Sequence, residues 1–318
     1  MTNKILPRFA ISALCLLGAV ISLVRASHPA SAAMSSLHSG ENQSRTTIPV
    51  LIAGRPASCV LDTGSSAMIV SPSFAQAAGL SGGGGTFELA PDGRTYMDRQ
   101  THIGRLDVAG HTLRDVPALI SPNLHGSDAL CGYDFFAHFP TLIDRGRHTV
   151  TLFPPSSRLA KMHCLLVDLA PHVPLATVEV NGSWLRHIVL DSGMAGGGAL
   201  WDGVRSQLHQ PLTSDAQYAT MPGAMRDGFT CGAVASVRYA AGAPATSMPI
   251  CTESQRPDGY NGILETNLPS VAAMAVDYPR RRMCFDVSTS SSSIARATTP
   301  STPRGGAWTR FNSLRPPQ

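Results

Sequence analysis

Charged side chains are scarce in this sequence, at 14% of its 318 residues, and aromatic side chains make up only 6%. Apolar residues account for 43%, which is enough for a sizeable core and argues against a disordered protein. Long helical repeats are also missing. Short apolar runs between 29 glycines and 24 prolines instead favour an all-β fold with many turns. Short helices are expected only at 72–78 and 201–208.

Several functional motifs are absent. There is no Cys-x-x-Cys and no His-Glu-x-x-His, so a zinc ribbon, a dithiol redox site and a zinc protease lack support. There is no basic stripe either, because residues 41–286 hold 18 basic and 21 acidic side chains, a net charge of −3. We therefore expect no nucleic-acid partner, no metal and no other cofactor.

The two ends of the chain differ in composition from its body. Residues 1–33 are typical of a secretory signal peptide, with Lys4 and Arg8, an apolar stretch over 9–24 and a small-residue cleavage site ending at Ala33. An uncleaved anchor is the alternative, and no later segment could span a membrane. We expect an exported protein, periplasmic or secreted, and a disordered tail over 288–318.

Six cysteines follow residue 33, and an even number in an oxidising compartment permits disulfides. Fifteen pairings are possible. The pair Cys231–Cys251, which would close a local loop, is favoured over the others. The alternative is that several of the six are buried as small apolar side chains.

Two short strings repeat within the chain. Leu61-Asp62-Thr63-Gly64 and Leu190-Asp191-Ser192-Gly193 each end an apolar run, and each follows a strand and a tight glycine turn. Residues 130–155 and 263–288 also align without a gap, which places Asp144 on Asp277. A repeat of this length indicates two similar lobes rather than a solenoid.

The repeat predicts the organisation of the chain. It comprises a signal peptide at 1–33, a flexible segment at 34–45, a first lobe at 46–157, an interlobe linker at 158–174, a second lobe at 175–287 and the tail at 288–318. Asp144 and Asp277 precede arginine-containing turns, so we expect them to be structural and to pair with local backbone or with Arg147 and Arg280.

The two Asp-Thr/Ser-Gly strings suggest that Asp62 and Asp191 meet across a groove that solvent reaches. Two carboxylates about 3 Å apart repel by roughly 5 kcal/mol at an effective dielectric of about 20, so they share one proton over a wide pH range. One can then deprotonate a water while the other polarises a carbonyl group, without a metal. The glycines Gly64 and Gly193 permit a close approach of the backbone.

The neighbouring hydroxyls have expected roles in supporting the dyad. Thr63 and Ser192 can hydrogen-bond across the lobe junction. Ser65 can hydrogen-bond Asp62 and favour its charged form, whereas Met194 cannot do this for Asp191. Asp191 is therefore expected to hold the shared proton.

These motifs, together with Gly132-Tyr133-Asp134-Phe135 and the segment 276–282, resemble the pepsin/retropepsin-type aspartic proteases, and most closely an exported bacterial retropepsin-like group with two lobes in one chain. Over residues 46–287 the resemblance implies bilobal acid-protease-like β-barrels with an interlobe cleft and few short helices. It also implies a monomeric endopeptidase that acts on a peptide or protein substrate held in an extended form.

The resemblance also implies β-hairpin flaps, and turn chemistry suggests Gly93, Tyr96 and Gly228 as candidates. An ordinary surface hairpin is an equal alternative at each place. Two positions depart from the family pattern, since Met194 stands where the family has Ser, Thr or Ala, and Glu265 stands where it has Gly.

Two other functional classes are considered. Asp191-Ser192-Gly193 also occurs in trypsin-like serine proteases, but the flanking glycines and an Ala-Ala-His-Cys segment are missing. A non-catalytic module with a degenerate second lobe, which would bind peptides or cell-envelope components, is the main alternative to aspartic endopeptidase activity.

Overall fold

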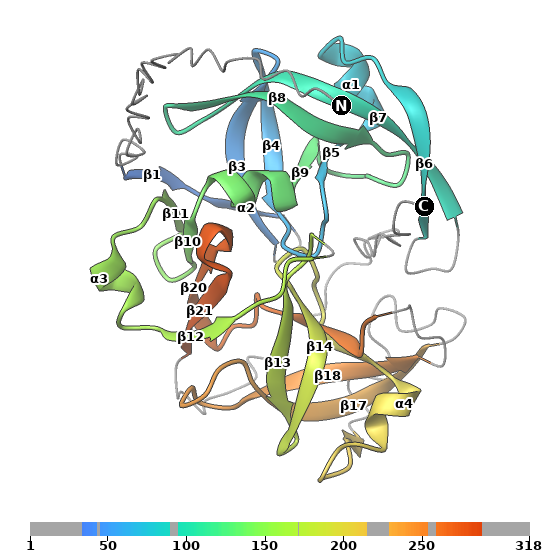
Figure 1. Ribbon diagram of the computed structural model, residues 1–318, viewed down its shortest axis with the longest axis vertical. Coiled ribbons are helices and arrows are strands. Elements are labelled where there is room, and N and C mark those ends of the chain that lie inside the picture. Colours follow the sequence, from blue (N-terminus) through green and yellow to red (C-terminus); the bar gives the residue numbers. More distant parts are fainter. Residues whose placement is uncertain are drawn as a thin grey trace, which may run out of the picture. The chain divides into compact units, whose positions relative to one another are not determined.

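The computed structural model describes residues 34–42, 45–89, 95–170, 172–214, 229–253 and 259–287. All of them belong to one compact unit, Ala33–Gln318. Strands dominate this part of the chain and the helices are short, which confirms the all-β prediction (Figure 1). Among these residues no helix is long and apolar enough to cross a membrane.

The first lobe is a closed barrel of six strands. Their order is β3-β4-β9-β5-β8-β7, and pairing of β3 with β7 closes the circle, while β2 and β6 extend it at two edges. The strands are β2 (Gly40–Asn42), β3 (Arg45–Ile52), β4 (Arg55–Leu61), β5 (Met68–Val70), β6 (Gly83–Leu89), β7 (Thr95–Val108), β8 (His111–Ile120) and β9 (Ala129–Cys131).

The second lobe closes in the same way. Its order is β13-β14-β19-β15-β18-β17, closed by pairing of β13 with β17 and extended by β16. The strands are β13 (Leu175–Val180), β14 (Ser183–Asp191), β15 (Gly198–Trp201), β16 (Thr213–Ser214), β17 (Phe229–Arg238), β18 (Thr246–Glu253) and β19 (Gly262–Glu265).

The two barrels correspond strand by strand, as the internal repeat predicts. Both begin with a hairpin whose two turn residues have positive φ, Ala53-Gly54 in the first and Asn181-Gly182 in the second. This is the backbone geometry of a turn that matches the right-handed twist of paired strands. In both barrels the second strand of this hairpin pairs in parallel with a later strand of the same barrel. These pairs are β4 with β9 and β14 with β19.

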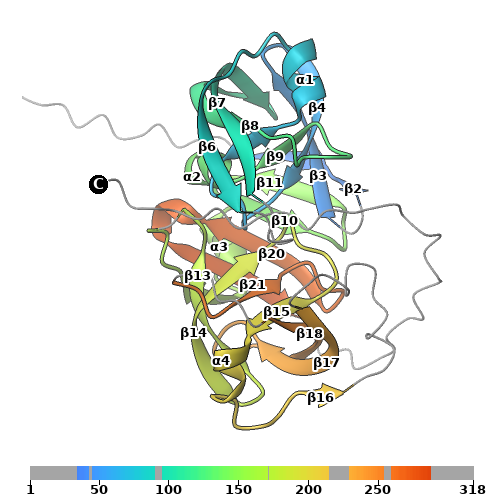
Figure 2. The same ribbon diagram turned by 90° about the vertical axis from the view of Figure 1, so that its right-hand side faces the viewer.

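A six-stranded sheet joins segments from the two halves of the chain. Its order is β1-β11-β10-β20-β21-β12, and β10 and β20 meet in antiparallel register at its centre (Figures 1 and 2). The strands are β1 (Ser35–His38), β10 (Thr141–Asp144), β11 (Thr149–Leu152), β12 (His163–Leu166), β20 (Val271–Asp277) and β21 (Arg282–Val287).

The strand pairing corrects two expectations. Residues 34–42, expected to be flexible, form β1 and β2, because β1 pairs with β11 and β2 pairs with β3. The segment 158–174, expected to be a linker, contributes β12, which pairs with β21. Asp144 and Asp277 are structural as predicted, with Arg147 Nη1 2.6 Å and Arg280 Nη1 3.3 Å from their carboxylates.

The helices are α1 (Pro72–Ala77), α2 (Tyr133–His138), α3 (Ser156–Leu159) and α4 (Asp202–Arg205), with one 3₁₀ turn, η2 (Tyr278–Arg280). α1 and α4 occur at the places where the sequence predicts helices. Ser71 caps α1 by accepting a hydrogen bond from the Phe74 amide, and proline occupies the first turn.

Three disulfides pair all six cysteines that follow residue 33. Cys231 bonds to Cys251 as favoured from the sequence, Cys59 bonds to Cys131, and Cys164 bonds to Cys284. Cys231–Cys251 links β17 to β18 in the second barrel, and Cys59–Cys131 links β4 to β9 in the first barrel. Cys164–Cys284 links β12 to β21. Cys59–Cys131 and Cys164–Cys284 join residues that are 72 and 120 positions apart, so these two disulfides restrict the unfolded chain most.

Candidate functional site

The two aspartates occupy matching places at the ends of buried strands. Asp62 follows β4, and Asp191 is the last residue of β14. The residues that lead into each aspartate are apolar and buried, so each strand lies in the barrel core up to the point where the loop begins. Both aspartates lie within the same compact unit.

Four hydrogen bonds join the two loops. The Thr63 hydroxyl donates to the Leu190 carbonyl oxygen at 2.7 Å and accepts from the Ser192 amide at 2.9 Å. In return, the Ser192 hydroxyl donates to the Leu61 carbonyl oxygen at 2.8 Å and accepts from the Thr63 amide at 3.1 Å. All four are buried, so each loop fixes the position of the other.

The glycines bring each carboxyl against the opposite loop. A Cβ added to Gly64 would lie 2.5 Å from Cγ of Asp191, and one added to Gly193 would overlap the carboxyl of Asp62. Any other residue at either place would collide with the carboxyl group from the other lobe. The structure thus brings Asp62, Thr63, Gly64, Asp191, Ser192 and Gly193 together at one junction.

The two carboxyls are electrostatically coupled. Burial is the main reason that the pKa of Asp191 lies well above its ordinary value, and the charge of Asp62 raises it further. The amides of Gly193 and Met194 donate to Asp191 Oδ1 at 2.6 and 3.1 Å and oppose this rise. The net direction favours the protonated form of Asp191.

Two expectations about the dyad are wrong. Asp62 and Asp191 are both 0% exposed, so solvent does not reach them in this structure. The Ser65 hydroxyl donates its proton to the Ala67 carbonyl oxygen at 2.9 Å, so that proton is not available to Asp62. The backbone of the Asp62 loop turns back on itself here, and a nearby carbonyl competes successfully for the hydroxyl.

Glu265 lies at the place that the alignment predicts. Its backbone pairs with Asp191, as Leu264 pairs with Leu190. Its carboxylate, however, bonds to the loop rather than to the dyad, because Oε2 accepts from the amides of Gly196 and Gly197 at 2.9 and 2.6 Å. Met194 is buried and contributes its amide to Asp191.

Three residues at the junction were missed by the sequence reasoning. The Tyr278 hydroxyl donates to the Thr63 carbonyl oxygen at 3.4 Å, and burial followed by the charges of Asp62 and Asp191 raises its pKa. Asn267 donates from its side-chain amide to the Ser192 carbonyl oxygen, and Arg145 donates to the backbone carbonyl oxygens of residues 267 and 268. The repeat aligns the segments that contain these residues, but an alignment does not show in which direction their side chains point.

Only one of the three flap candidates, Tyr96, lies among the described residues. Tyr96 lies in β7, opposite Glu88 of β6. Gly93 and Gly228 lie outside the described residues. The hairpin formed by β6 and β7 exists, and the flap role stays a prediction.

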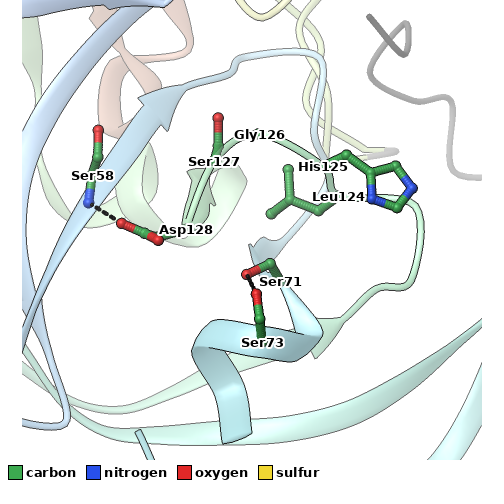
Figure 3. A pocket seen from close by; sticks show the side chains of 8 residues that line it. All are labelled: Ser58, Ser71, Ser73, Leu124, His125, Gly126, Ser127 and Asp128. Carbon is green, nitrogen blue, oxygen red and sulfur yellow. Dashed lines mark hydrogen bonds between the residues drawn. The ribbon is translucent and has the colours of Figure 1, made fainter. Parts of the chain in front are cut away.

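A polar hollow of about 380 Å³ is formed by the first lobe alone (Figure 3). Its lining comes from β4, the start of α1 and the loop before β9, namely Ser58, Ser71, Ser73, Leu124, His125, Gly126, Ser127 and Asp128. Asp128 accepts a hydrogen bond from the Ser58 amide at 2.9 Å. No residue of either aspartate loop lines it, so this hollow is separate from the dyad. Within the described residues, no cluster of three or more acidic, histidine or cysteine side chains could hold a metal ion.

The two closed β-barrels, with Asp-Thr/Ser-Gly at the end of β4 and of β14, form a bilobal acid-protease-like fold. Residues 48–138 match the family model described as gag-polyprotein putative aspartyl protease. The match covers less than a third of the chain and makes the first barrel similar to the retropepsin-like aspartyl proteases.

A retropepsin-like aspartic protease from Rickettsia conorii aligns at 13% identity over 38% of this chain and 90% of that one, with a TM-score of 0.28, which is too low to bear on the fold. The search of curated proteins finds no match.

Proposed function

We propose that this protein is an aspartic endopeptidase in which Asp62 and Asp191 share one proton and activate a water for peptide-bond hydrolysis. The observation that carries the proposal is the reciprocal contact of the two loops, in which each carboxyl lies against the glycine of the opposite loop. No second pair of carboxyls in the described residues combines this burial, coupling and repeat symmetry.

The electrostatics divide the work between the two acids. Asp191, with its raised pKa, holds the proton and donates it to the carbonyl oxygen of the scissile bond. Asp62, in its charged form, accepts a proton from water as the water attacks the carbonyl carbon. As the resulting diol collapses and the C–N bond breaks, Asp62 gives its proton to the leaving nitrogen and Asp191 takes a proton from a diol hydroxyl, which restores the starting state of both acids, as in aspartic proteases generally.

Burial of both carboxyls sets a condition on this function. Water and substrate reach the dyad only in a state in which the surrounding chain has moved aside, because both side chains are fully covered in this structure.

The alternative is a binding module without catalysis, and the same burial favours it. Such a protein would hold a peptide through backbone hydrogen bonds while its carboxyls stay out of contact with water. This alternative rests on Met194 and Glu265, which depart from the family pattern in the second lobe, although the second barrel has the same strand order as the first.

The test is proteolysis of denatured casein between pH 3 and 7 by the full chain, by Asp62→Asn and by Asp191→Asn, with fragments identified by mass spectrometry. Loss of cleavage in both variants supports the endopeptidase. Equal cleavage by all three proteins would assign the activity to a contaminant. No cleavage by any protein, with retained binding of a statine-containing peptide in calorimetry, would favour the binding module.

We further propose that the protein is exported and acts as a monomer. Three disulfides among the described residues support an oxidising compartment. The two loops of one chain supply both acids, so a second copy is not required to complete the site. Fractionation of the producing cells and light scattering of the purified protein test these two statements.

A further inference from the structure

We infer that Glu265 is a positioning residue that fixes the loop carrying Asp191 by holding the amides of Gly196 and Gly197. This inference rests on the proposed function, because it assigns the residue that orders one half of the proposed dyad. It concerns a position at which the two barrels differ, so the first barrel serves as an internal comparison.

The strand register shows which residue of the first barrel occupies the place that Glu265 has in the second barrel. In the second barrel Asp191 pairs with Glu265. In the first barrel Leu61 pairs with Cys131, and the Asp62 amide donates to the Cys131 carbonyl oxygen, so Gly132 lies beside Asp62. A Cβ on Gly132 would lie 2.6 Å from the Ser65 carbonyl oxygen and would overlap that of Ala67. The first loop therefore excludes any side chain at this place, whereas the second accommodates a glutamate.

The second loop makes room because it is one residue longer. Ile69 pairs with Leu130 in the first barrel, and the corresponding pair in the second is Ala199 with Ile263. The chain thus takes seven steps from Asp62 to Ile69 but eight from Asp191 to Ala199. The extra length lies in a glycine run, where Gly196 and Gly197 have φ of 104° and 115°, which other residues rarely adopt.

Glu265 fills the space that the longer loop leaves. Its Oε2 accepts hydrogen bonds from the amides of Gly196 and Gly197, and its own amide donates to the Gly197 carbonyl oxygen at 3.0 Å. Three hydrogen bonds therefore join one residue of β19 to the far end of the loop. At the near end of the same loop, the amides of Gly193 and Met194 bind the Asp191 carboxyl, so the loop connects the two carboxyls mechanically.

The charges around Glu265 agree with this role. The side chain is 5% exposed, and burial raises its pKa to about 7, opposed by the two glycine amides and by the charge of Arg145. Tyr239 donates its hydroxyl proton to the Glu265 carbonyl oxygen. The strongest influences on the pKa of Asp191 are burial, Asp62 and the local amides, so Glu265 acts through the loop rather than by its charge on the dyad.

The experiment compares the full chain with Glu265→Gln, which keeps an oxygen acceptor, and Glu265→Ala, which removes it. Glu179→Ala is the matched control, because it removes a carboxylate from the same barrel that pairs with Arg238. Two measurements are made on each protein. Amide hydrogen exchange is followed by mass spectrometry for peptides covering 192–198 and 63–67, and kcat and KM are measured on one quenched-fluorescent peptide selected from the casein cleavage sites.

We expect Glu265→Ala to speed exchange in 192–198 by roughly tenfold or more and to leave 63–67 unchanged, because only the second loop loses its hydrogen-bond acceptor. We also expect kcat to fall by roughly 10- to 100-fold with KM within about twofold. Glu265→Gln and Glu179→Ala should resemble the full chain in both measurements, which separates the acceptor from the mere loss of a buried acid.

Three results would overturn the inference. Unchanged exchange in 192–198 for Glu265→Ala would show that Glu265 does not fix the loop, whether or not the protein cleaves peptides. Faster exchange with unchanged kcat would show that the loop needs no such support for catalysis. Equal losses in Glu265→Gln and Glu265→Ala would assign the effect to the ionised form and not to the acceptor. Absence of cleavage by the full chain would reject the proposed function and the catalytic role with it, whereas the hold on the loop is still measured by exchange.

Discussion

Replacement of Glu265 by glutamine should change how the stability of the protein depends on pH. The carboxyl has a pKa of about 7 in the folded protein and 4.5 as its reference value, and burial is the main cause of the difference. A shift of about 2.5 pK units corresponds to about 3 kcal/mol, at about 1.4 kcal/mol for each unit. The folded state therefore favours the protonated form of this group by that amount.

The sign follows from the direction of the shift. Because the pKa is raised on folding, the contribution of the protonated carboxyl is fully present below pH 4.5 and is lost as the pH rises through about 7. Glutamine is uncharged at every pH and carries no such dependence. The free energy of unfolding of Glu265→Gln, minus that of the unsubstituted chain, should therefore increase by about 3 kcal/mol between pH 4 and pH 8.

The assay is urea unfolding of both proteins, with disulfides intact, at half-unit intervals of pH. Tryptophan fluorescence, to which the buried Trp201 of the second barrel contributes, reports on the relevant lobe. Contributions of the dyad to the pH dependence are common to both proteins and cancel in the difference. A difference that stays constant within about 1 kcal/mol across this range would refute the burial of an ionisable group at position 265.

Three further predictions concern the candidate site. Two test the junction of the loops, and the third tests the absence of a metal from the proposed mechanism. Gly193→Ala should abolish cleavage and lower stability by about 1–3 kcal/mol, since its Cβ would overlap Asp62. Gly203→Ala is the control, because a Cβ there meets nothing within 4 Å, and it should leave cleavage and stability unchanged. Cleavage assays and thermal unfolding of both variants test this. Thr63→Val and Ser192→Ala should each destabilise by about 1–3 kcal/mol. They should be strongly non-additive in a double-mutant cycle, because each hydroxyl accepts from the backbone amide of the other residue, and additive values would contradict the reciprocal contact. A chelator should leave the rate of casein cleavage unchanged, because the proposed mechanism uses no metal, and loss of activity that zinc restores would reject it.

Much of the fold follows from local patterns in the sequence. Apolar runs, paired turns at 53–54 and 181–182, and the alignment of Asp144 with Asp277 suffice to predict two similar barrels, because these features depend on residues close in the chain. The Cys231–Cys251 disulfide is also local. The strands β1 and β12 were not anticipated, because their partners lie more than 100 residues away and edge strands have no distinctive composition.

The site is less predictable than the fold, for a related reason. Sequence identifies Asp62 and Asp191 by their repeat, but accessibility depends on how everything else packs, and both side chains are buried. The Ser65 hydroxyl has several acceptors within reach, and only the loop conformation decides for Ala67. The direction of the Glu265 side chain depends on one extra residue in a glycine-rich loop, whose effect on backbone geometry no pattern describes.

The sharing of one proton by two carboxyls can be measured directly. In protein labelled with ¹³C at aspartate Cγ, the chemical shifts of residues 62 and 191 are followed from pH 2 to 9, with assignments from Asp62→Asn and Asp191→Asn. The account predicts two coupled titration steps, with Asp191 protonated well above the ordinary range, and a lower pKa for Asp191 once Asp62→Asn removes the neighbouring charge. Two independent titrations near pH 4, unaffected by substitution of the other residue, would contradict it.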